Sequence, residues 1–195
     1  MQKTISYALL FMILTISCTN PFSARESEPP SENEGTYITP VEPQLVLVNL
    51  EASYNEKIIT NYMQCLDTLF AYRYDFLQFQ GPDSGWGYNS EISLTDKIFA
   101  AFRSSSESIS LSLSLAPIES LPDLEDDTTA TIHREYELIS ISDIDIAMPD
   151  TTFYRGTASF ELIETGVNLW RLRRWTDNHA SPNDTAWSDF KNGYR

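Results

Sequence analysis

The sequence predicts one domain of the α+β class. Its front half carries apolar residues at helical spacing, whereas its back half alternates apolar and polar residues at every second position. The clearest alternation is SISLSLSLA at 108–116, which is typical of a strand with one buried face. With 195 residues, of which 42% are hydrophobic and 12% aromatic, the chain is long enough for one core and too short for two ordinary domains.

Residues 1–17 have the make-up of a signal peptide. Lys3 supplies a positive start, and the apolar run from Tyr7 to Ile16 is shorter than the roughly 20 residues that a membrane-spanning helix needs. Cys18 follows directly. The segment LTISC at 14–18 is similar to a bacterial lipobox, although its leucine stands four residues before the cysteine instead of three. The resemblance implies that Cys18 receives lipid and that the chain is cleaved before it; ordinary secretion and an uncleaved anchor are the alternatives.

Residues 18–36 form the next segment, which is rich in Pro, Ser, Glu and Asn. Such a stretch buries too little surface to offset the entropy of ordering, so we expect a disordered acidic tether. The folded domain is then residues 37–195. Lipid on Cys18 would hold this domain to a membrane of the bacterial cell envelope, on its periplasmic or extracellular face.

The charge of the chain limits its partners. Its 28 acidic residues outnumber its 13 basic ones, which gives a formal net charge of −15. Affinity for nucleic acid rests mainly on neutralising phosphates, so the composition argues against a nucleic-acid partner. The same charge opposes adsorption to an anionic lipid surface, and membrane attachment therefore depends on the lipid anchor.

Two helices open the domain. The first is predicted within 41–57, with Pro43 near its first turn and a break at Asn55-Glu56 before the second helix. Its apolar positions recur at helical spacing in two sets: Leu47, Leu50 and Tyr54, and Val48 and Ala52. The second helix is predicted over 57–69. Its apolar stripe comprises Ile58, Tyr62, Cys65, Leu66 and Leu69. Cys65 is expected to be a buried thiol of the core.

A strand and a third helix follow. Residues 70–79 alternate and are rich in residues that favour strands. Residues 81–87 carry glycines and a proline, which indicate a loop. The third helix is predicted over 93–105, with Ser93 as its N-terminal cap. Its buried face comprises Ile98, Phe99 and Phe102.

Strands make up most of the back half. After 108–116 comes an acidic loop at 119–127, for which a calcium site is the alternative to a solvated loop; the loop lacks the spacing of an EF-hand. Residues 131–148 shift the phase of their apolar positions, which indicates a β-bulge. A turn is predicted at 149–153 and a further strand at 154–164.

The last strand is predicted over 169–177. Trp170 and Leu172 share one face. The opposite face is assigned Leu169, Arg171, Arg173 and Trp175. The basic cluster Arg171, Arg173 and Arg174 pairs with acids on neighbouring strands or, as the alternative, recognises an anion. Residues 178–195 have no strong period and indicate an irregular tail with three aromatic anchors: Trp187, Phe190 and Tyr194.

Three segments carry a resemblance to a known superfamily. They are LEASYNEKIITNYMQCLD at 50–67, FAYRYDF at 70–76 and the closing strand pair at 156–177. Their order resembles the nuclear transport factor 2-like (NTF2-like) superfamily, which includes SnoaL-like cyclases and ketosteroid isomerase. The resemblance covers residues 41–178. It implies a cone-shaped α+β fold, in which a strongly curved antiparallel sheet wraps around about three N-terminal helices.

The resemblance also implies a candidate pocket inside the cone. Its residues would be Tyr62, Tyr72, Asp75, Phe99, Phe102, Tyr136, Tyr154 and Trp170. The alternative is that the aromatic residues are plain core. Enzymatic relatives place a carboxylate inside the cone for proton transfer, for which Asp75 is the candidate, with Tyr54 or Tyr72 as a hydrogen-bond donor. A surface carboxylate paired with Arg73 is the alternative for Asp75.

No motif in the sequence identifies a reaction. A Ser-His-Asp order, a His/Cys metal spacing and a glycine-rich phosphate loop are all missing, so the sequence indicates no catalytic residue, no metal and no cofactor. We therefore expect a membrane-anchored lipoprotein with a non-catalytic binding domain, whose partner is a small apolar ligand or an envelope protein. A homodimer through the sheet is also compatible with the pattern. The alternative is a small-molecule isomerase, dehydratase or hydrolase of the ketosteroid isomerase or SnoaL-like type.

Overall fold

The computed structural model describes residues 35–74, 85–103, 110–142, 150–166, 168–181 and 184–195. All of them belong to the second of the two units into which the chain divides, Ser31–Arg195. The helices of this part are α2 (Pro43–Glu56), α3 (Ile59–Cys65), α4 (Tyr88–Arg103) and α5 (Trp187–Asn192). The strands are β1 (Leu66–Tyr74), β2 (Gly85–Gly87), β3 (Ser110–Pro117), β4 (Leu124–Glu125), β5 (Thr129–Ser142), β6 (Asp150–Thr165) and β7 (Leu169–His179). The predicted α+β class is confirmed.

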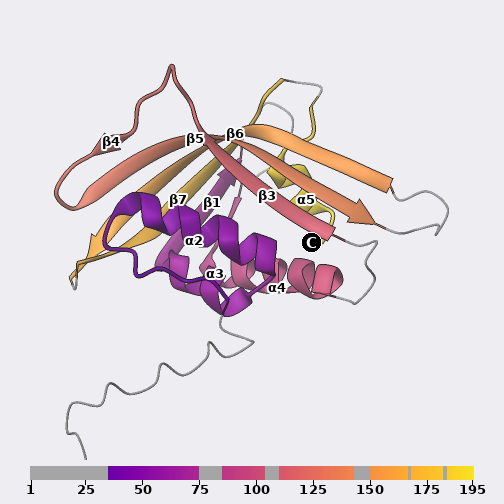
Figure 1. The fold of residues 1–195 in the computed structure, drawn as a ribbon, viewed down its shortest axis with the longest axis horizontal. Coiled ribbons are helices and arrows are strands. Elements are labelled where there is room, and N and C mark those ends of the chain that lie inside the picture. Colours follow the sequence, from indigo (N-terminus) through magenta and orange to yellow (C-terminus); the bar gives the residue numbers. More distant parts are fainter. Residues whose placement is uncertain (1–34, 75–84, 104–109, 143–149, 167, 182–183) are drawn as a thin grey trace, which may run out of the picture. The chain divides into compact units, whose positions relative to one another are not determined.

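The strands form one mixed sheet in the order β2-β1-β7-β6-β5-β3, and β4 pairs with β5. β1 runs parallel to β7, and the other described pairs are antiparallel. Figure 1 shows α2, α3 and α4 gathered on one side of this sheet. Apolar residues from the helices and from the strands join in one core, so any interior site must lie between these two layers.

α2 lies within the segment predicted to be the first helix. Pro43 occupies its first turn, where a fixed φ and a missing N–H cost nothing. The helix stops before Lys57, whose backbone is left-handed at φ 58°. Leu47, Leu50 and Tyr54 are buried and form the core face, whereas Val48 of the same predicted pattern is 44% exposed because it lies on the opposite side of the helix.

The second helix is shorter than predicted. α3 ends at Cys65, and Leu66 already pairs with Leu172 of β7. Leu69 is therefore wrong as a member of a helical stripe, because it lies on β1 and is 69% exposed. The helical pattern of apolar residues continues for one turn beyond Cys65, but pairing with β7 places these residues in a strand. The aromatic alternation in the first part of this strand is confirmed, since Phe70, Tyr72 and Tyr74 are buried.

α4 begins earlier than predicted. It starts at Tyr88, so Ser93 lies inside the helix and is not its cap. The predicted loop at 81–87 ends in β2, which pairs with β1 through Trp86 opposite Tyr72. Short edge strands of this kind have no clear sequence pattern. The predicted buried face of Ile98, Phe99 and Phe102 is confirmed.

β5 keeps one register with β6 throughout 129–142 and with β3 over 134–141. The predicted bulge is therefore wrong for this range, and its remaining positions at 143–148 lie outside the described residues. The predicted turn at 149–153 is also wrong from Asp150 onward, because β6 already pairs with β5 there. Backbone pairing between β5 and β6 continues past the alternating apolar residues, so the paired strands are longer than that pattern predicts.

One bulge of this sheet lies in β7, and the β1–β7 pair has a further register shift between Leu66 and Ala71. Glu161 of β6 is opposite Arg174, whereas Leu162 is opposite Leu172, so Arg173 is the extra residue. One extra residue reverses the faces that follow it. Trp175, which the alternation placed on the outer face, is for this reason fully buried.

The bulge also sets the partners of the arginines. Arg173 Nε lies 3.0 Å from Asp67 Oδ1 on β1, and Arg174 Nη1 lies 3.0 Å from Glu161 Oε1 on β6. Arg171 Nη1 donates to the carbonyl oxygen of Leu66. Pairing with acids on neighbouring strands is thus confirmed for Arg173 and Arg174.

The free edge of β3 is covered by a side chain of α2. Asn55 Nδ2 donates to the Leu113 carbonyl oxygen at 3.1 Å, and the Leu113 N–H donates to Asn55 Oδ1 at 2.7 Å. This amide satisfies both backbone groups as a neighbouring strand would.

We expect Asn55→Ala to lower the free energy of unfolding by about 1–3 kcal/mol, because both Leu113 groups lose their partner. Urea unfolding followed by circular dichroism measures the change. Asn89→Ala, at an exposed position of α4, is the matched control and should change stability by less than about 0.5 kcal/mol. Equal effects of the two substitutions would contradict this role of Asn55.

The acidic loop holds one clear ion pair. Both carboxylate oxygens of Asp123 accept hydrogen bonds from Arg134 at 2.9 Å, and Oδ1 also accepts the His133 N–H at 3.0 Å. In the described part of the chain, no group of three or more His, Cys, Asp or Glu is arranged to hold a metal ion. Likewise, none of the described helices is long and apolar enough to cross a membrane.

Candidate functional site

The chain fills its own interior with α5. Trp187 and Lys191 of this helix are fully buried, and Phe190 is 4% exposed. The Trp187 ring makes edge contacts with Tyr54 of α2 (centroids 5.0 Å apart) and with Trp175 of β7 (4.2 Å). The predicted anchoring role of Trp187 and Phe190 is confirmed, although the anchors sit on a helix instead of an irregular tail.

Asp177 of β7 holds the start of α5. Its fully buried carboxylate accepts hydrogen bonds from Tyr136 Oη (2.6 Å), from Tyr72 Oη (3.1 Å) and from the Ser188 N–H (2.7 Å). The Trp187 N–H donates in turn to Tyr136 Oη at 2.8 Å. Two backbone N–H groups of the first turn of α5 are thus satisfied by this carboxylate and its tyrosine.

Gly156 makes room for this arrangement. It lies opposite Tyr136 in the β5–β6 pair. A Cβ atom at position 156 would lie 2.4 Å from Tyr136 Oη and 2.3 Å from the Asn178 carbonyl oxygen. Any side chain here would therefore displace the tyrosine from Asp177.

Glu91 of α4 is a second fully buried carboxylate. It accepts a short hydrogen bond from Tyr62 Oη, and it also accepts Trp86 Nε1–H at 2.5 Å and Thr95 Oγ1–H at 3.2 Å. Lys191 Nζ of α5 lies 2.5 Å from Glu91 Oε1, and both side chains are fully buried. The second carboxylate therefore also fixes α5, through an ion pair.

Aromatic rings surround the ammonium group of Lys191. Its Nζ lies 4.2 Å from the ring centroid of Tyr72, 4.1 Å from that of Trp175 and 5.7 Å from that of Trp187. Each ring can contribute a cation–π attraction, which is stronger where water is excluded. Burial lowers the pKa of Lys191, and the adjacent Glu91 carboxylate opposes this effect.

The interior tyrosines act as neutral donors. Burial, followed by the nearby Glu91, raises the pKa of Tyr62. Burial and Asp177 raise the pKa values of Tyr72 and Tyr136. Burial also raises the pKa of Asp177 itself, while the hydrogen bonds from Tyr136 and Ser188 lower it. These buried groups can stabilise charge and donate hydrogen bonds in fixed directions. The two carboxylates, Glu91 and Asp177, already accept hydrogen bonds from groups of this chain.

The predicted pocket residues fall into two groups and one outlier. Tyr62, Tyr72, Phe99 and Tyr136 lie in the interior around the two carboxylates and Tyr54. Phe102 and Tyr154 both contact Phe190, at centroid distances of 6.1 and 5.0 Å, and Tyr154 is half-buried. Trp170 is buried near the start of α2, where its backbone N–H donates to the Pro40 carbonyl oxygen. Asp75 and Cys18 lie outside the described residues. A ligand pocket formed by these residues stays a prediction.

The sequence reasoning missed Glu91, Asp177 and Lys191. Asp177 stands two residues after Trp175, so its inward direction follows only once the bulge at Arg173 is known. Glu91 fell in a segment predicted to precede the third helix. Lys191 lay in a segment without a period, although its spacing from Trp187 is one helical turn.

The other predicted residues are placed as follows. Cys65 is buried, as expected, and burial raises the pKa of its thiol to about 12, which makes it a poor nucleophile. His133 Nδ1 lies 2.9 Å from Ser159 Oγ. His179 Nε2 lies 2.9 Å from Asp189 Oδ2 of α5.

The surface hollows of the described residues include two beside the strands and helix of the interior site. One of about 580 Å³ lies over β3, β5 and β6. It is lined by Ser114, Ala116, Glu135, Tyr136, Glu137, Arg155, Gly156, Thr157 and Ala180. The other, of about 340 Å³, lies beside α4. Its lining includes Trp86, Ser93 and Lys97.

The buried Asp177 predicts a pH dependence of stability. A raised pKa in the folded state means that the folded protein takes up a proton before the unfolded chain does. Asp177 therefore favours folding more as pH falls from its raised pKa to the usual value near 3.8, and this advantage is lost as pH rises. We expect the free energy of unfolding of the wild type to gain on that of Asp177→Asn as pH falls from 7 toward about 4. Urea unfolding of both proteins at several pH values measures this.

Asp123→Asn provides a control of opposite sign. The pKa of Asp123 is lowered, because the bonds from Arg134 and the His133 N–H outweigh its partial burial. The wild type should therefore lose stability relative to Asp123→Asn as pH falls through the lowered pKa. The same trend in both variants would contradict the assignment for Asp177.

Comparison with known proteins supports the fold. No protein-family model matches the sequence, and no curated protein sequence matches it. A solved structure from Kribbella flavida is 14% identical, with a TM-score of 0.57 over 72% of this chain and 89% of that one. A proposed scytalone dehydratase of Novosphingobium aromaticivorans is 10% identical (TM-score 0.52, 68% and 78% covered). The β subunit of benzoate 1,2-dioxygenase of Burkholderia mallei is 11% identical (TM-score 0.51, 69% and 86% covered).

These likenesses show that the domain has the NTF2-like, or SnoaL-like, fold. The predicted resemblance is thereby confirmed at the level of architecture. At such low identity the likeness concerns the fold alone, so the chemistry of this chain must be argued from its own residues.

Proposed function

We propose that the protein is a lipoprotein anchored through Cys18, whose NTF2-like domain binds a partner and performs no reaction. The observation that carries the non-catalytic role is the occupation of the interior by α5. Lys191 is paired with Glu91, and the Ser188 N–H is bonded to Asp177, so both interior carboxylates are engaged within the chain. The sequence around Cys18 supports the anchor.

The anchor is tested by labelling cells with a radioactive fatty acid. The wild type should carry the label and remain with the membrane fraction, and Cys18→Ala should lose both properties. Cys65→Ala is the matched control, because it removes the other cysteine of the chain and should keep the label. Labelled Cys18→Ala, or membrane retention without label, would reject lipidation at Cys18.

One observation favours the enzymatic alternative, an isomerase, dehydratase or hydrolase. Asp177 has a raised pKa and lies within hydrogen-bond distance of two tyrosine hydroxyls, as a carboxylate tuned for proton transfer would. Asp177 is fully buried and bonded to the Ser188 N–H of α5, so a substrate would have to displace these contacts.

Hydrogen exchange of the α5 amides separates the two roles. A binding domain with a permanently filled interior should exchange these amides as slowly as those of β6 and β7. Exchange much faster than in these strands would mean that the interior opens, and would favour the enzyme.

A further inference from the structure

The outer side of α2 is apolar. Leu45, Val48 and Ala52 recur at the spacing of helical turns on the side opposite the buried face, and Val41 continues the row just before the helix. Val48 is 44% exposed and Val41 is 57% exposed. A surface helix normally carries polar residues on its solvent side, so a second apolar side indicates a contact.

The segment that enters the domain extends this row. The Ile38 N–H donates to Asn49 Oδ1 at 2.8 Å, and Asn49 Nδ2 donates to the Ile38 carbonyl oxygen at 2.6 Å. The Thr36 N–H donates to Glu56 Oε2 at 2.7 Å. Ile38 is thereby fixed beside α2 while remaining 43% exposed. We call the resulting surface the α2 outer face; it consists of Ile38, Val41, Leu45, Val48 and Ala52.

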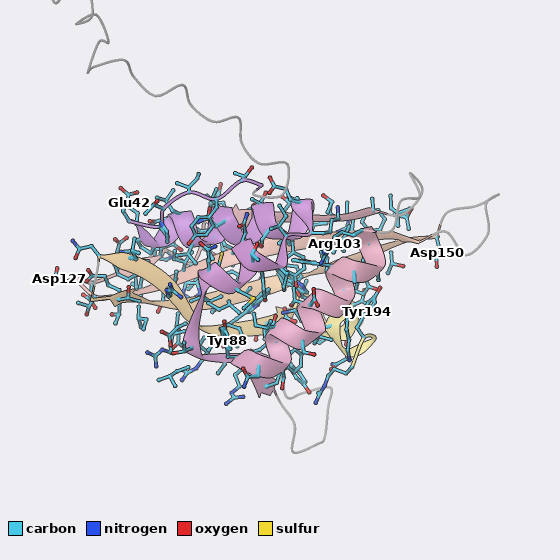
Figure 2. All side chains as sticks on the ribbon, turned by 90° about the horizontal axis from the view of Figure 1, so that it is seen from below. Glu42, Tyr88, Arg103, Asp127, Asp150 and Tyr194 are labelled. Carbon is cyan, nitrogen blue, oxygen red and sulfur yellow. The ribbon has the colours of Figure 1, made fainter. Side chains whose placement is uncertain are left out.

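Acidic residues border the α2 outer face on both sides. Glu42 and Glu56 lie along one side of the row. Glu51 lies along the other side, where it is half-buried and its carboxylate accepts a hydrogen bond from the Leu115 backbone of β3. Figure 2 shows Glu42 at the start of α2. Glu125 of β4 is also close, since its carboxylate accepts Gln44 Nε2–H at 3.3 Å. An apolar row between carboxylates is complementary to an apolar segment between basic residues.

We propose that the α2 outer face docks a partner protein of the cell envelope through an apolar segment flanked by Lys or Arg. This inference rests on the proposed binding function and names its surface and its kind of partner. An anionic lipid surface and a second copy of this acidic chain would both meet like charge at the rim, which disfavours them as occupants. Attraction between rim and partner should set the rate and the specificity of docking.

The proposal is tested in living cells with the full-length protein. A photo-crosslinking amino acid replaces Val48, and in a matched control it replaces Met63, which is 36% exposed on α3. Irradiation should join position 48, and not position 63, to one protein of defined mass. The crosslinked peptide of that protein should contain apolar residues flanked by Lys or Arg. Combining the probe with Glu42→Gln and Glu51→Gln should reduce the adduct at least fivefold.

Several results would overturn the proposal. These are a lipid adduct, an adduct with a second copy, a partner peptide without basic residues, an adduct that ignores the rim substitutions, and no adduct in a probe-bearing protein that melts at the wild-type temperature. Fatty-acid labelling of the same cells keeps this test separate from the anchor. A labelled protein without adduct rejects the docking surface alone, whereas an adduct without label rejects the anchor alone.

Discussion

Glu91→Ala should lower the free energy of unfolding by about 3–5 kcal/mol, because removing one partner of a buried ion pair leaves the other charge uncompensated. Lys191 would keep its ammonium group among aromatic rings without a carboxylate. Tyr62 and Trp86 would lose their acceptor as well. Chemical denaturation of the purified domain measures the loss.

The double variant Glu91→Gln with Lys191→Met separates charge from packing. Gln retains an acceptor for Tyr62 and Trp86, and Met keeps much of the apolar length of the lysine side chain. Since no isolated charge then remains, the double variant should be more stable than Glu91→Ala and than Lys191→Met alone. Glu161→Ala, which breaks the exposed pair with Arg174, should cost about 1 kcal/mol or less. A loss for Glu91→Ala no larger than this would contradict the buried pair.

The interior thus combines features that seldom occur together in a plain core. Two carboxylates, one ammonium group and several tyrosine hydroxyls lie among aromatic rings, and the described polar contacts close within the chain. An apolar core would give similar stability at lower desolvation cost. The polar groups add specificity of position. Each carboxylate accepts a hydrogen bond from a defined atom of α5 and so fixes the position and orientation of this helix.

The helices α2, α3 and α4 and the long strands could be predicted in outline because their patterns are local, whereas α5 could not. Pro43 marks a helix start, and the leucines of residues 111–115 alternate without interruption. Burial of Tyr62, Tyr72 and Phe99 followed from the same periodicities. The fold class needed only these signals.

The two carboxylates could not be predicted because they depend on events elsewhere in the chain. A single extra residue at Arg173 turns Trp175 and Asp177 inward, and no local pattern announces that insertion. Lys191 is charged, and a charged residue in an unpatterned segment is normally assigned to the surface. Its burial makes sense only together with Glu91, which is distant in sequence.

Trp187→Ala should lower the free energy of unfolding by about 3–5 kcal/mol, as expected for truncating a fully buried tryptophan. The indole contacts Tyr54, Tyr136 and Trp175, and its Nε1–H donates to Tyr54 Oη at 3.2 Å. Without these contacts α5 keeps Lys191, Phe190 and the bond from the Ser188 N–H to Asp177 as its main attachments. Hydrogen exchange should therefore accelerate in α5 far more than in the paired strands β5 and β6.

Two further substitutions show whether the effect belongs to the interior. Trp187→Phe keeps a ring for the edge contacts and loses the bond to Tyr54, so its loss of stability should fall between those of the wild type and Trp187→Ala. Phe153→Ala removes an aromatic residue that is 44% exposed and should cost much less. If Trp187→Ala left both the stability of the domain and the hydrogen exchange of α5 unchanged, α5 would not be fixed in the interior, and the non-catalytic role would lose its support.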